Sequence, residues 1–380
     1  MSTFNNTAMR FPTGNLDFLN NALTSLGEAF EFLTMSMIIM QRGWSTSIPE
    51  PDRGADVLAF NNVRRYSIPV QVKAARVLTA DYPQVRNATR QRRHAYQIDI
   101  SRRQLEELDR DPQPFIVWLI REEVEPLALV LRGEILTSIR QIRPGAQDQL
   151  NVFFYQSYDD QNDILYHSHV NDEYQLREYV EAWDDCFPRN DIPDADRKMM
   201  LGAATENLTI HYLLLQEGGW TAAKPHPDRG ADILALQNDN DVSIPCQVKA
   251  SMIELTSGRE NTARTNSVVP FHFTVSTPQA SDLQRRKEGT IFVLWLCFSE
   301  VSPYRWEPLI FRGDELWENK PGVWNLQTDN FWAYVSLENS NPVDHVLHEN
   351  KPIESIVFGG PTRDPTDVTS AYRNWEIFGQ

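Results

Sequence analysis

Residues 51–73 read PDRGADVLAFNNVRRYSIPVQVK, and residues 227–249 read PDRGADILALQNDNDVSIPCQVK. The two stretches align without a gap at an offset of 176 residues (227 − 51 = 176). A duplicated fold needs to keep only the spacing of its apolar residues, yet these stretches also share an Asp, a Gln and a Lys. The sequence therefore predicts one polar site that is built twice.

The lysine of the first copy stands out from its surroundings. Lys73 is the only lysine among residues 1–190, where the other nineteen basic residues are all Arg. An ammonium group can lose its proton, whereas a guanidinium group stays charged. A lysine at this position therefore indicates chemistry more than solubility.

The length and composition are typical of a folded chain with two domains. Of the 380 residues 41% are hydrophobic, and the repeat offset leaves each unit about 175 residues, enough for a core of its own. We expect domain 1 at residues 1–187 with its core at 20–140. A linker at 188–197 then leads to domain 2 at 198–380, with its core at 198–315.

The cysteines and the apolar runs indicate the cellular compartment in which the protein is expected. Cys186, Cys246 and Cys297 form no paired spacing, so neither a disulfide framework nor a zinc site is indicated, and a reducing cytoplasm is expected. Cys246 stands where the first copy has Val70, which predicts a buried strand residue. No apolar run approaches the ~18–20 residues of a membrane span, so no membrane partner is expected.

The net charge of −16 argues against non-specific coating of nucleic acid, which depends on neutralising phosphates. Positive charge can still be gathered locally. One arginine cluster is opposed only by Asp99, and it predicts either a phosphate-contacting loop or a solvated face. Its members are Arg86, Arg90, Arg92, Arg93, Arg102 and Arg103.

Each copy predicts the order α–β–β–β–α–β, an α/β fold of the α+β kind with a small mixed sheet flanked by helices. The first copy suggests a helix at 30–40, a turn-rich loop at 45–53, and strands at 56–60, 68–74, 95–100 and 115–120. The second copy suggests a helix at 208–215, a loop at 221–229, and strands at 232–236, 244–250, 271–275 and 291–296. The apolar run at 115–120 predicts a strand that is buried on both faces.

The shared polar residues predict a cation site in each copy. Asp56 begins one strand of a hairpin, and Gln71 and Lys73 lie two apart on the other, so they share a face. Glu31, on the preceding helix, can pack against that face. The second copy supplies Glu206, Asp232, Gln247 and Lys249.

Oxygen ligands of this kind suit Mg²⁺ or Mn²⁺, and the backbone carbonyl of Val72 or Val248 can add another ligand. A bound divalent ion polarises a phosphoryl oxygen and lowers the pKa of its water. A neighbouring lysine orients that water, or takes its proton if the lysine is itself deprotonated. These residues therefore predict hydrolysis of a phosphodiester.

The same residues resemble a known family. Gly-x-x-x-Glu, a helix, Gly-Trp, then Gly-Ala-Asp and Gln-Val-Lys is similar to the restriction-endonuclease-like PD-(D/E)XK superfamily, in the Gln-x-Lys form of Mrr-like and other prokaryotic defence nucleases. The resemblance covers residues 20–140 and 195–315, so it implies two tandem nuclease-like domains. It implies that Asp56 and Asp232 bind the metal and that Gln71 and Gln247 fill the next ligand position. It further implies that Lys73 and Lys249 are the catalytic lysines and that Glu31 and Glu206 are the helical acids.

The leading hypothesis is thus a metal-dependent DNA endonuclease, acting on duplex DNA, with two pseudo-symmetric active sites and a role in defence against foreign DNA. In a structural alternative, Asp56 and Lys73 form a salt bridge that was copied with the domain. In others, the chain binds nucleic acid or a protein without cutting, only one unit cuts, or the substrate is a DNA junction. The sequence has no nucleotide-binding motif, so an NTPase or sensor partner would be a separate chain, and homo-oligomerisation stays open.

Overall fold

The computed structural model divides by its internal contacts into unit 1, Met1–Met200, and unit 2, Leu201–Gln380. It describes residues 16–49, 55–78, 92–110, 113–121, 126–138, 149–167, 173–191, 194–216, 220–225, 231–237, 242–252, 268–274, 289–298, 306–318, 330–337, 353–358 and 366–379. In these ranges no helix is both long enough and apolar enough to cross a bilayer.

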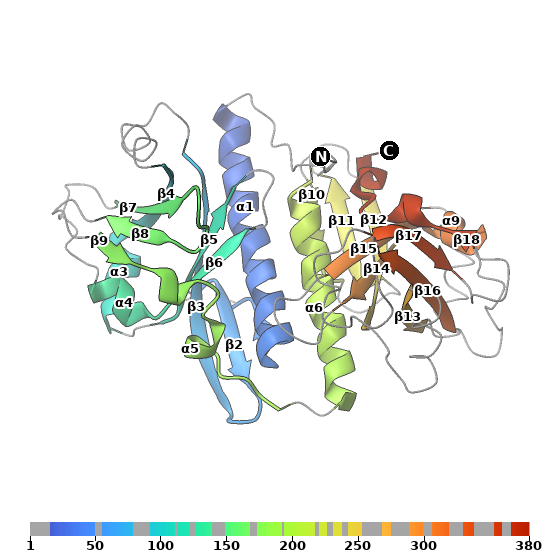
Figure 1. Cartoon of the computed structure of the whole chain (residues 1–380), viewed down its shortest axis with the longest axis horizontal. Helices are drawn as coiled ribbons and strands as arrows, with labels where there is room; N and C mark the ends of the chain where they lie inside the picture. Colours follow the sequence, from blue (N-terminus) through green and yellow to red (C-terminus); the bar gives the residue numbers. More distant parts are fainter. Residues whose placement is uncertain are drawn as a thin grey trace. The chain divides into compact units, whose positions relative to one another are not determined.

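Unit 1 contains a long helix and two sheets (Figure 1). Helix α1 (Leu16–Met37) continues into the π-helix η1 (Ile38–Arg42) and ends at Gly43, whose φ of 69° is readily adopted by glycine. The central sheet has the order β1-β2-β3-β5-β6, in which only the β3–β5 pair is parallel. Its strands are β1 (Ser45–Ser47), β2 (Val57–Asn61), β3 (Tyr66–Arg76), β5 (Phe115–Ile120) and β6 (Leu127–Leu131).

A second, antiparallel sheet of unit 1 has the order β4-β7-β8-β9. Its strands are β4 (Arg93–Ser101), β7 (Gln149–Ser157), β8 (Ile164–His167) and β9 (Glu173–Gln175). The remaining elements are short helices, namely α3 (Arg102–Arg110), α4 (Gly133–Ser138), η2 (Arg177–Tyr179) and α5 (Trp183–Cys186).

Unit 2 repeats this plan. Its central sheet has the order β10-β11-β12-β14-β15, and β13-β16-β17-β18 form the second sheet. The long helix is α6 (Asp194–Leu214), and the strands of the central sheet are β10 (Trp220–Ala223), β11 (Ile233–Gln237), β12 (Val242–Met252), β14 (Ile291–Cys297) and β15 (Trp306–Arg312). The others are β13 (Val268–Thr274), α9 (Gly313–Glu318), β16 (Asn330–Leu337), β17 (Ile353–Phe358), β18 (Thr366–Asp367), η4 (Thr369–Ala371) and η5 (Trp375–Gly379).

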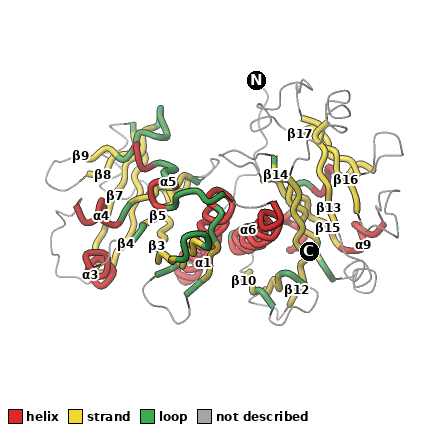
Figure 2. Tube along the Cα trace, turned by 90° about the horizontal axis from the view of Figure 1, so that it is seen from below, coloured by secondary structure: helices red, strands yellow, loops and turns green. Residues whose placement is uncertain are grey.

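The central sheet of unit 1 is the middle of three layers. Helix α1 lies against one face (Figure 2), and the second sheet and α3 cover the other. Strand β5 shows both environments, since Phe115, Val117 and Leu119 pack toward β4 and β7 while Trp118 points to α1. Every residue of β5 is buried, which confirms the prediction of a strand covered on both faces.

The predicted mixed α/β class of the α+β kind is confirmed, but two predicted loops contain strands and two predicted strands join a second sheet. The expected turn-rich loops at 45–53 and 221–229 contain the edge strands β1 and β10, and short edge strands carry little periodicity for a sequence to reveal. The strands expected at 95–100 and 271–275 belong to the second sheets, as β4 and β13. Alternation marks a half-buried strand but does not say which sheet it joins.

The segment expected to be a linker, residues 188–197, is largely structured. The Asn190 amide donates to the Arg42 carbonyl at 2.9 Å, and α6 already begins at Asp194. The acidic residues that suggest a linker also favour the first turn of a helix, where they meet the positive end of its dipole. The short helix expected after β13 lies outside the described residues.

A buried hydrogen bond joins the long helix to the central sheet in both units. Trp118 Nε1 donates to Thr34 Oγ1 at 2.8 Å, and Trp295 Nε1 donates to Thr209 Oγ1 at 2.9 Å. Both threonine hydroxyls donate in turn to a helical carbonyl four residues earlier, that of Phe30 or Thr205. The hydroxyls thus fix the height of each helix on its sheet.

Replacing Thr34 by Val should destabilise unit 1 by about 1–3 kcal/mol, because the buried Trp118 N–H then has no acceptor there. Urea unfolding followed by tryptophan fluorescence measures the change. Thr34→Ser keeps the hydroxyl and is the matched control, and Thr209→Val repeats the test in unit 2. Equal stability of the Val and Ser variants would contradict this account.

Candidate active sites where a strand changes partner

The predicted site of unit 1 lies where β3 exchanges one neighbour for another. Strand β3 pairs with β2 over Tyr66–Val70 and with β5 over Gln71–Arg76. The last backbone bond on the β2 side runs from the Asp56 amide to the Val70 carbonyl, at 3.0 Å. The first on the β5 side runs from the Gln71 amide to the Pro114 carbonyl, also at 3.0 Å.

Directly past this point no described strand pairs with β3 on the β2 side, and the next backbone pairing there is the bridge between Val77 and Tyr96 of β4. The Val72 amide points to that side, and it donates to Asp56 Oδ2 at 2.7 Å. The carboxylate thus replaces the missing strand carbonyl. An amide bonded to a carboxylate makes a stronger hydrogen bond than one bonded to a neutral carbonyl.

Unit 2 reproduces this geometry. The Asp232 amide donates to the Cys246 carbonyl at 2.9 Å, and the Val248 amide donates to Asp232 Oδ2 at 2.7 Å. The carboxylate–amide distance is the same in both units. The duplication therefore keeps the site geometry as well as the residues.

The lysines lie one residue beyond these amides. Lys249 Nζ is 3.6 Å from Asp232 Oδ2, and each of the two side chains is 18% exposed. Lys73 has the equivalent place on β3 and is also half-buried. The ion pair in unit 2 is the contact that the structural alternative expects, and it also puts an ammonium beside the proposed metal ligand.

The glutamines are the most buried members of the sites, with Gln71 3% and Gln247 4% exposed. Gln104 Nε2, from α3, donates to Gln71 Oε1 at 3.2 Å. The same Gln104 caps its own helix, because its Oε1 accepts from the Ser101 amide and the Gln104 amide donates to Ser101 Oγ. The sequence reasoning missed Gln104, although Ser-x-x-Gln before a helix is a capping-box signal that could have found it.

The helical acids are placed in different surroundings. Helix α1, which carries the half-buried Glu31, packs against β2 and β3 on the face to which Trp118 points. Gln71 and Lys73 pair with Phe115 and Val117, whose side chains point to the other face, so the prediction that α1 packs against the face of Gln71 and Lys73 was wrong.

In unit 2, Glu206 forms an ion pair with Lys224, and its Oε2 atom lies 2.8 Å from Lys224 Nζ. Ile48 stands at the Lys224 position in unit 1 (224 − 176 = 48), so this cation belongs to unit 2 alone.

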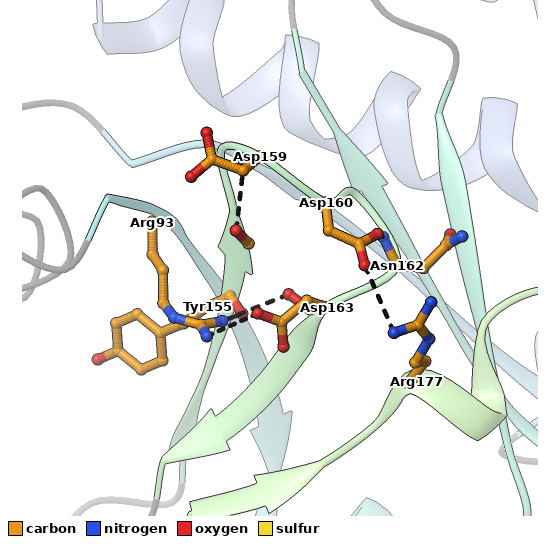
Figure 3. A network of polar contacts seen from close by, with 8 residues as sticks. Arg93, Tyr155, Asp159, Asp160, Asn162, Asp163 and Arg177 are labelled. Atoms are coloured by element: carbon orange, nitrogen blue, oxygen red, sulfur yellow. Dashed lines mark hydrogen bonds and ion pairs between the residues drawn. The ribbon is translucent and has the colours of Figure 1, made fainter.

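The three arginines of the predicted cluster whose side chains the structure describes all form ion pairs within the protein. Arg93 reaches the turn between β7 and β8 (Figure 3), where its guanidinium bonds the Asp163 carboxylate at 2.8 Å and two backbone carbonyls. Arg92 pairs with Asp159 and Arg103 with Glu107, each at 2.8 Å and on the surface. Arg86, Arg90 and the side chain of Arg102 lie outside the described residues, so the phosphate-contacting loop stays a prediction.

The predicted sites offer oxygen atoms, rather than a cluster of acidic side chains, as ligands for a divalent metal ion. Across the described ranges, no group of three or more His, Cys, Asp or Glu side chains could hold a metal. The predicted ligands are instead one strand carboxylate, one amide oxygen and one backbone carbonyl. In a strand, residues two apart turn their backbone groups to the same side, so the Val72 carbonyl faces the side of Asp56, as that of Val70 does. An all-oxygen set of this kind fits Mg²⁺ or Mn²⁺, which keep several waters.

Cys246, beside this site, is buried and free, as predicted. Burial raises the pKa of its thiol to about 12, and the Asp232 carboxylate adds to the shift. A thiol with a raised pKa is almost entirely protonated at neutral pH and is a poor nucleophile, which agrees with the predicted role of a buried strand residue.

No protein-family model matches the chain, and no curated protein matches it.

Replacing Asp56 by Ala and replacing it by Asn should change the free energy of unfolding by different amounts. Asp56→Ala leaves the Val72 amide without this acceptor and should lower the free energy of unfolding by about 1–3 kcal/mol. Asp56→Asn keeps an acceptor oxygen and should cost less than about 1 kcal/mol. Urea unfolding measures both, and Asp232→Ala and Asp232→Asn repeat the pair in unit 2. If Asn is as damaging as Ala, the hydrogen bond is not the main contribution of Asp56.

The Cys246 thiol should not react with a thiol reagent at pH 8 unless the protein is unfolded. The folded-state pKa lies above the unfolded value, so burial of the neutral thiol stabilises the fold fully below about pH 8.5. That stabilisation is lost as the pH rises toward 12. Thermal melts between pH 8 and 11 should show a smaller loss in Cys246→Val, which carries the unit 1 residue, than in the wild type. Fast labelling of the native protein at this cysteine would refute the assignment.

Proposed function

We propose that the chain is a metal-dependent DNA endonuclease with two restriction-endonuclease-like units, each of which has a site for phosphodiester hydrolysis. The observation that carries the proposal is the duplicated carboxylate–amide contact on the strand that bears Gln-x-Lys. It links Asp56 to Val72 and Asp232 to Val248, at 2.7 Å in both units. Cytoplasmic location is part of the same proposal.

In unit 1, different residues would bind the metal, position a ligand and orient the attacking water. Asp56, the Gln71 side chain and the Val72 carbonyl would hold Mg²⁺ or Mn²⁺, which supplies Lewis-acid polarisation of a phosphoryl oxygen when bound. Gln104 positions Gln71, because it fixes the amide group through a hydrogen bond. Lys73 Nζ orients the attacking water by hydrogen bonding, and in its neutral form it accepts the water's proton.

In unit 2 the same roles fall to Asp232, Gln247, Val248 and Lys249. Two sites on one polypeptide would allow it to cut both strands of a duplex without a partner subunit, as a dimer of single-site nucleases does. A setting in defence against foreign DNA rests on family resemblance alone.

The summed side-chain charges of the two sites support a difference in their affinity for a divalent cation. In unit 1 the predicted residues Glu31, Asp56 and Lys73 sum to −1. In unit 2, Lys224 joins the equivalent three and raises the sum to zero. A divalent cation is therefore expected to bind unit 1 more tightly, and unit 1 to contribute more of the cleavage.

A second candidate is a nuclease-like module that binds nucleic acid, or a partner protein, without cutting it. The observation in its favour is that no described cluster of three acidic, His or Cys side chains could hold a metal. The ion pair between Lys249 and Asp232 also competes for a carboxylate that a metal would need. Binding without any product, with or without divalent ions, would support this candidate.

Replacing both lysines should abolish cleavage, because general acid–base groups contribute about 10²–10⁴-fold. The assay follows nicking and linearisation of a plasmid in Mg²⁺, in Mn²⁺ and in EDTA. Lys73→Ala/Lys249→Ala should be inactive, and Lys73→Ala should lose more activity than Lys249→Ala. Lys73→Arg keeps the charge without a removable proton and is the matched variant. Equal rates for the wild type and the double Ala variant would rule out the proposed sites.

A further inference from the structure

The hairpins that carry the two candidate sites differ sharply in charge. Val57–Arg76 contains four basic residues and no acidic one, for a net charge of +4. The equivalent Ile233–Met252 contains one basic residue and two acidic ones, for a net charge of 1 − 2 = −1. Both stretches form paired strands with the same partners, so the fold does not require this difference. In a chain with a net charge of −16, a stretch without acidic residues indicates a partner that is negatively charged.

The charge in unit 1 is concentrated at the turn, where Arg64 and Arg65 are both exposed. Unit 2 has Asn240 and Asp241 at these positions, and Asp239 precedes them. The neighbouring Val63 is 66% exposed, so an apolar side chain is also presented to solvent at the tip.

The tip of the hairpin, residues 61–66, projects from the sheet because the first half of β3 does not pair with β5. Strand β3 meets β5 only from Gln71 onward, so the stretch Tyr66–Val70 has β2 but neither β5 nor β6 beside it. Figure 1 shows β2 and β3 extending beyond β5 and β6. The short edge strand β1 pairs with β2 at Leu58–Phe60, so the part that projects beyond every paired neighbour is the turn after Phe60.

The turn holds its arginines in a fixed conformation. The side-chain oxygen of the buried Asn61 accepts from the Arg64 amide at 2.9 Å, and its carbonyl accepts from the Arg65 amide at 2.8 Å. Arg65 has a φ of 57°, a conformation that few non-glycine residues adopt. At the base of the tip, Tyr66 packs edge-on against the buried Trp44, with ring centroids 5.4 Å apart. A preformed turn loses little entropy on binding.

We propose that the β2–β3 hairpin of unit 1 is a DNA-binding element in which Arg64 and Arg65 contact backbone phosphates of a duplex. The inference rests on the proposed function, since it assigns duplex DNA to the same chain. The equivalent stretch of unit 2 does not share this role, because Asp239 and Asp241 in its sequence repel phosphate.

The strand geometry predicts where these contacts fall on the DNA. Eight residues separate Arg65 from Lys73 on β3, which is about 26 Å at ~3.3 Å per residue. At ~3.4 Å per base pair this length corresponds to about 8 base pairs. The arginine contacts should therefore lie up to about 8 base pairs from the phosphate that is cut in unit 1.

The test is fluorescence anisotropy with a labelled 30-base-pair DNA duplex in EDTA, so that binding is measured without cleavage. The tip variant is Arg64→Gln/Arg65→Asn, because Asn tolerates the left-handed conformation of Arg65. It should bind at least 10-fold more weakly, and the slope of log affinity against log salt should shrink by about 2. Arg132→Ala/Arg177→Ala removes two exposed charges elsewhere in unit 1 and should change the affinity less than 3-fold. Arg64→Lys/Arg65→Lys should restore most of the binding.

The outcomes separate this inference from the proposed function. If the wild type binds the duplex and the tip variant matches it in affinity and salt slope, the hairpin assignment is wrong and the nuclease proposal is untouched. If the tip variant loses binding but Lys73→Ala/Lys249→Ala still cuts, the hairpin assignment stands and the proposed sites fall. If the wild type does not bind the duplex even at low salt, the hairpin assignment fails. Circular dichroism melts of each variant confirm that the fold is kept.

Discussion

Both candidate sites depend on one hydrogen bond, from a strand amide to a carboxylate at the place where that strand changes its neighbour. Strand β3 pairs with β2 up to Val70 and with β5 from Gln71 onward, so no described strand offers a carbonyl to the Val72 amide. Leaving such a group unsatisfied would cost about 1–3 kcal/mol. Asp56 supplies the acceptor, and Asp232 does so in unit 2. The fold thus places a carboxylate beside Gln71 and Lys73 for a structural reason, and the proposed metal chemistry would use the same group.

The duplicated units have kept their internal contacts and changed their charges. The threonine–tryptophan bond between helix and sheet and the carboxylate–amide bond at the sites recur at nearly equal distances. By contrast, Ile48 of unit 1 stands at the position of Lys224, and the sequence of unit 2 has Asn240 and Asp241 at the positions of Arg64 and Arg65. Packing constrains the first set of residues, whereas Arg64, Arg65 and Lys224 lie at exposed or half-exposed positions where the fold does not determine the charge. This pattern supports two units with the same scaffold and different tasks.

Much of each central sheet and its site could be predicted from local sequence, and the tertiary contacts could not. The apolar run at 115–120 determines a strand that is buried on both faces, and the Asp…Gln-x-Lys spacing places Asp56 at the backbone of Val72, the residue between Gln71 and Lys73. The second sheets were missed, because the alternation in β4 is the same whichever sheet the strand joins. Gln104 was missed because its contact to Gln71 spans 33 residues. Arg93 carries charge in any reading of the sequence, and only the fold reveals that Asp163 neutralises it.

The most direct measurement of the central claim is the anomalous scattering of Mn²⁺ in a crystal soaked with that ion. The account predicts a peak about 2.0–2.3 Å from a carboxylate oxygen of Asp56 and within ligand distance of the Val72 carbonyl, with a weaker peak at Asp232. Both peaks should disappear in Asp56→Asn/Asp232→Asn crystals while the strands stay in register. A soaked crystal without manganese at either aspartate, or with the ion bound only elsewhere, would contradict the account.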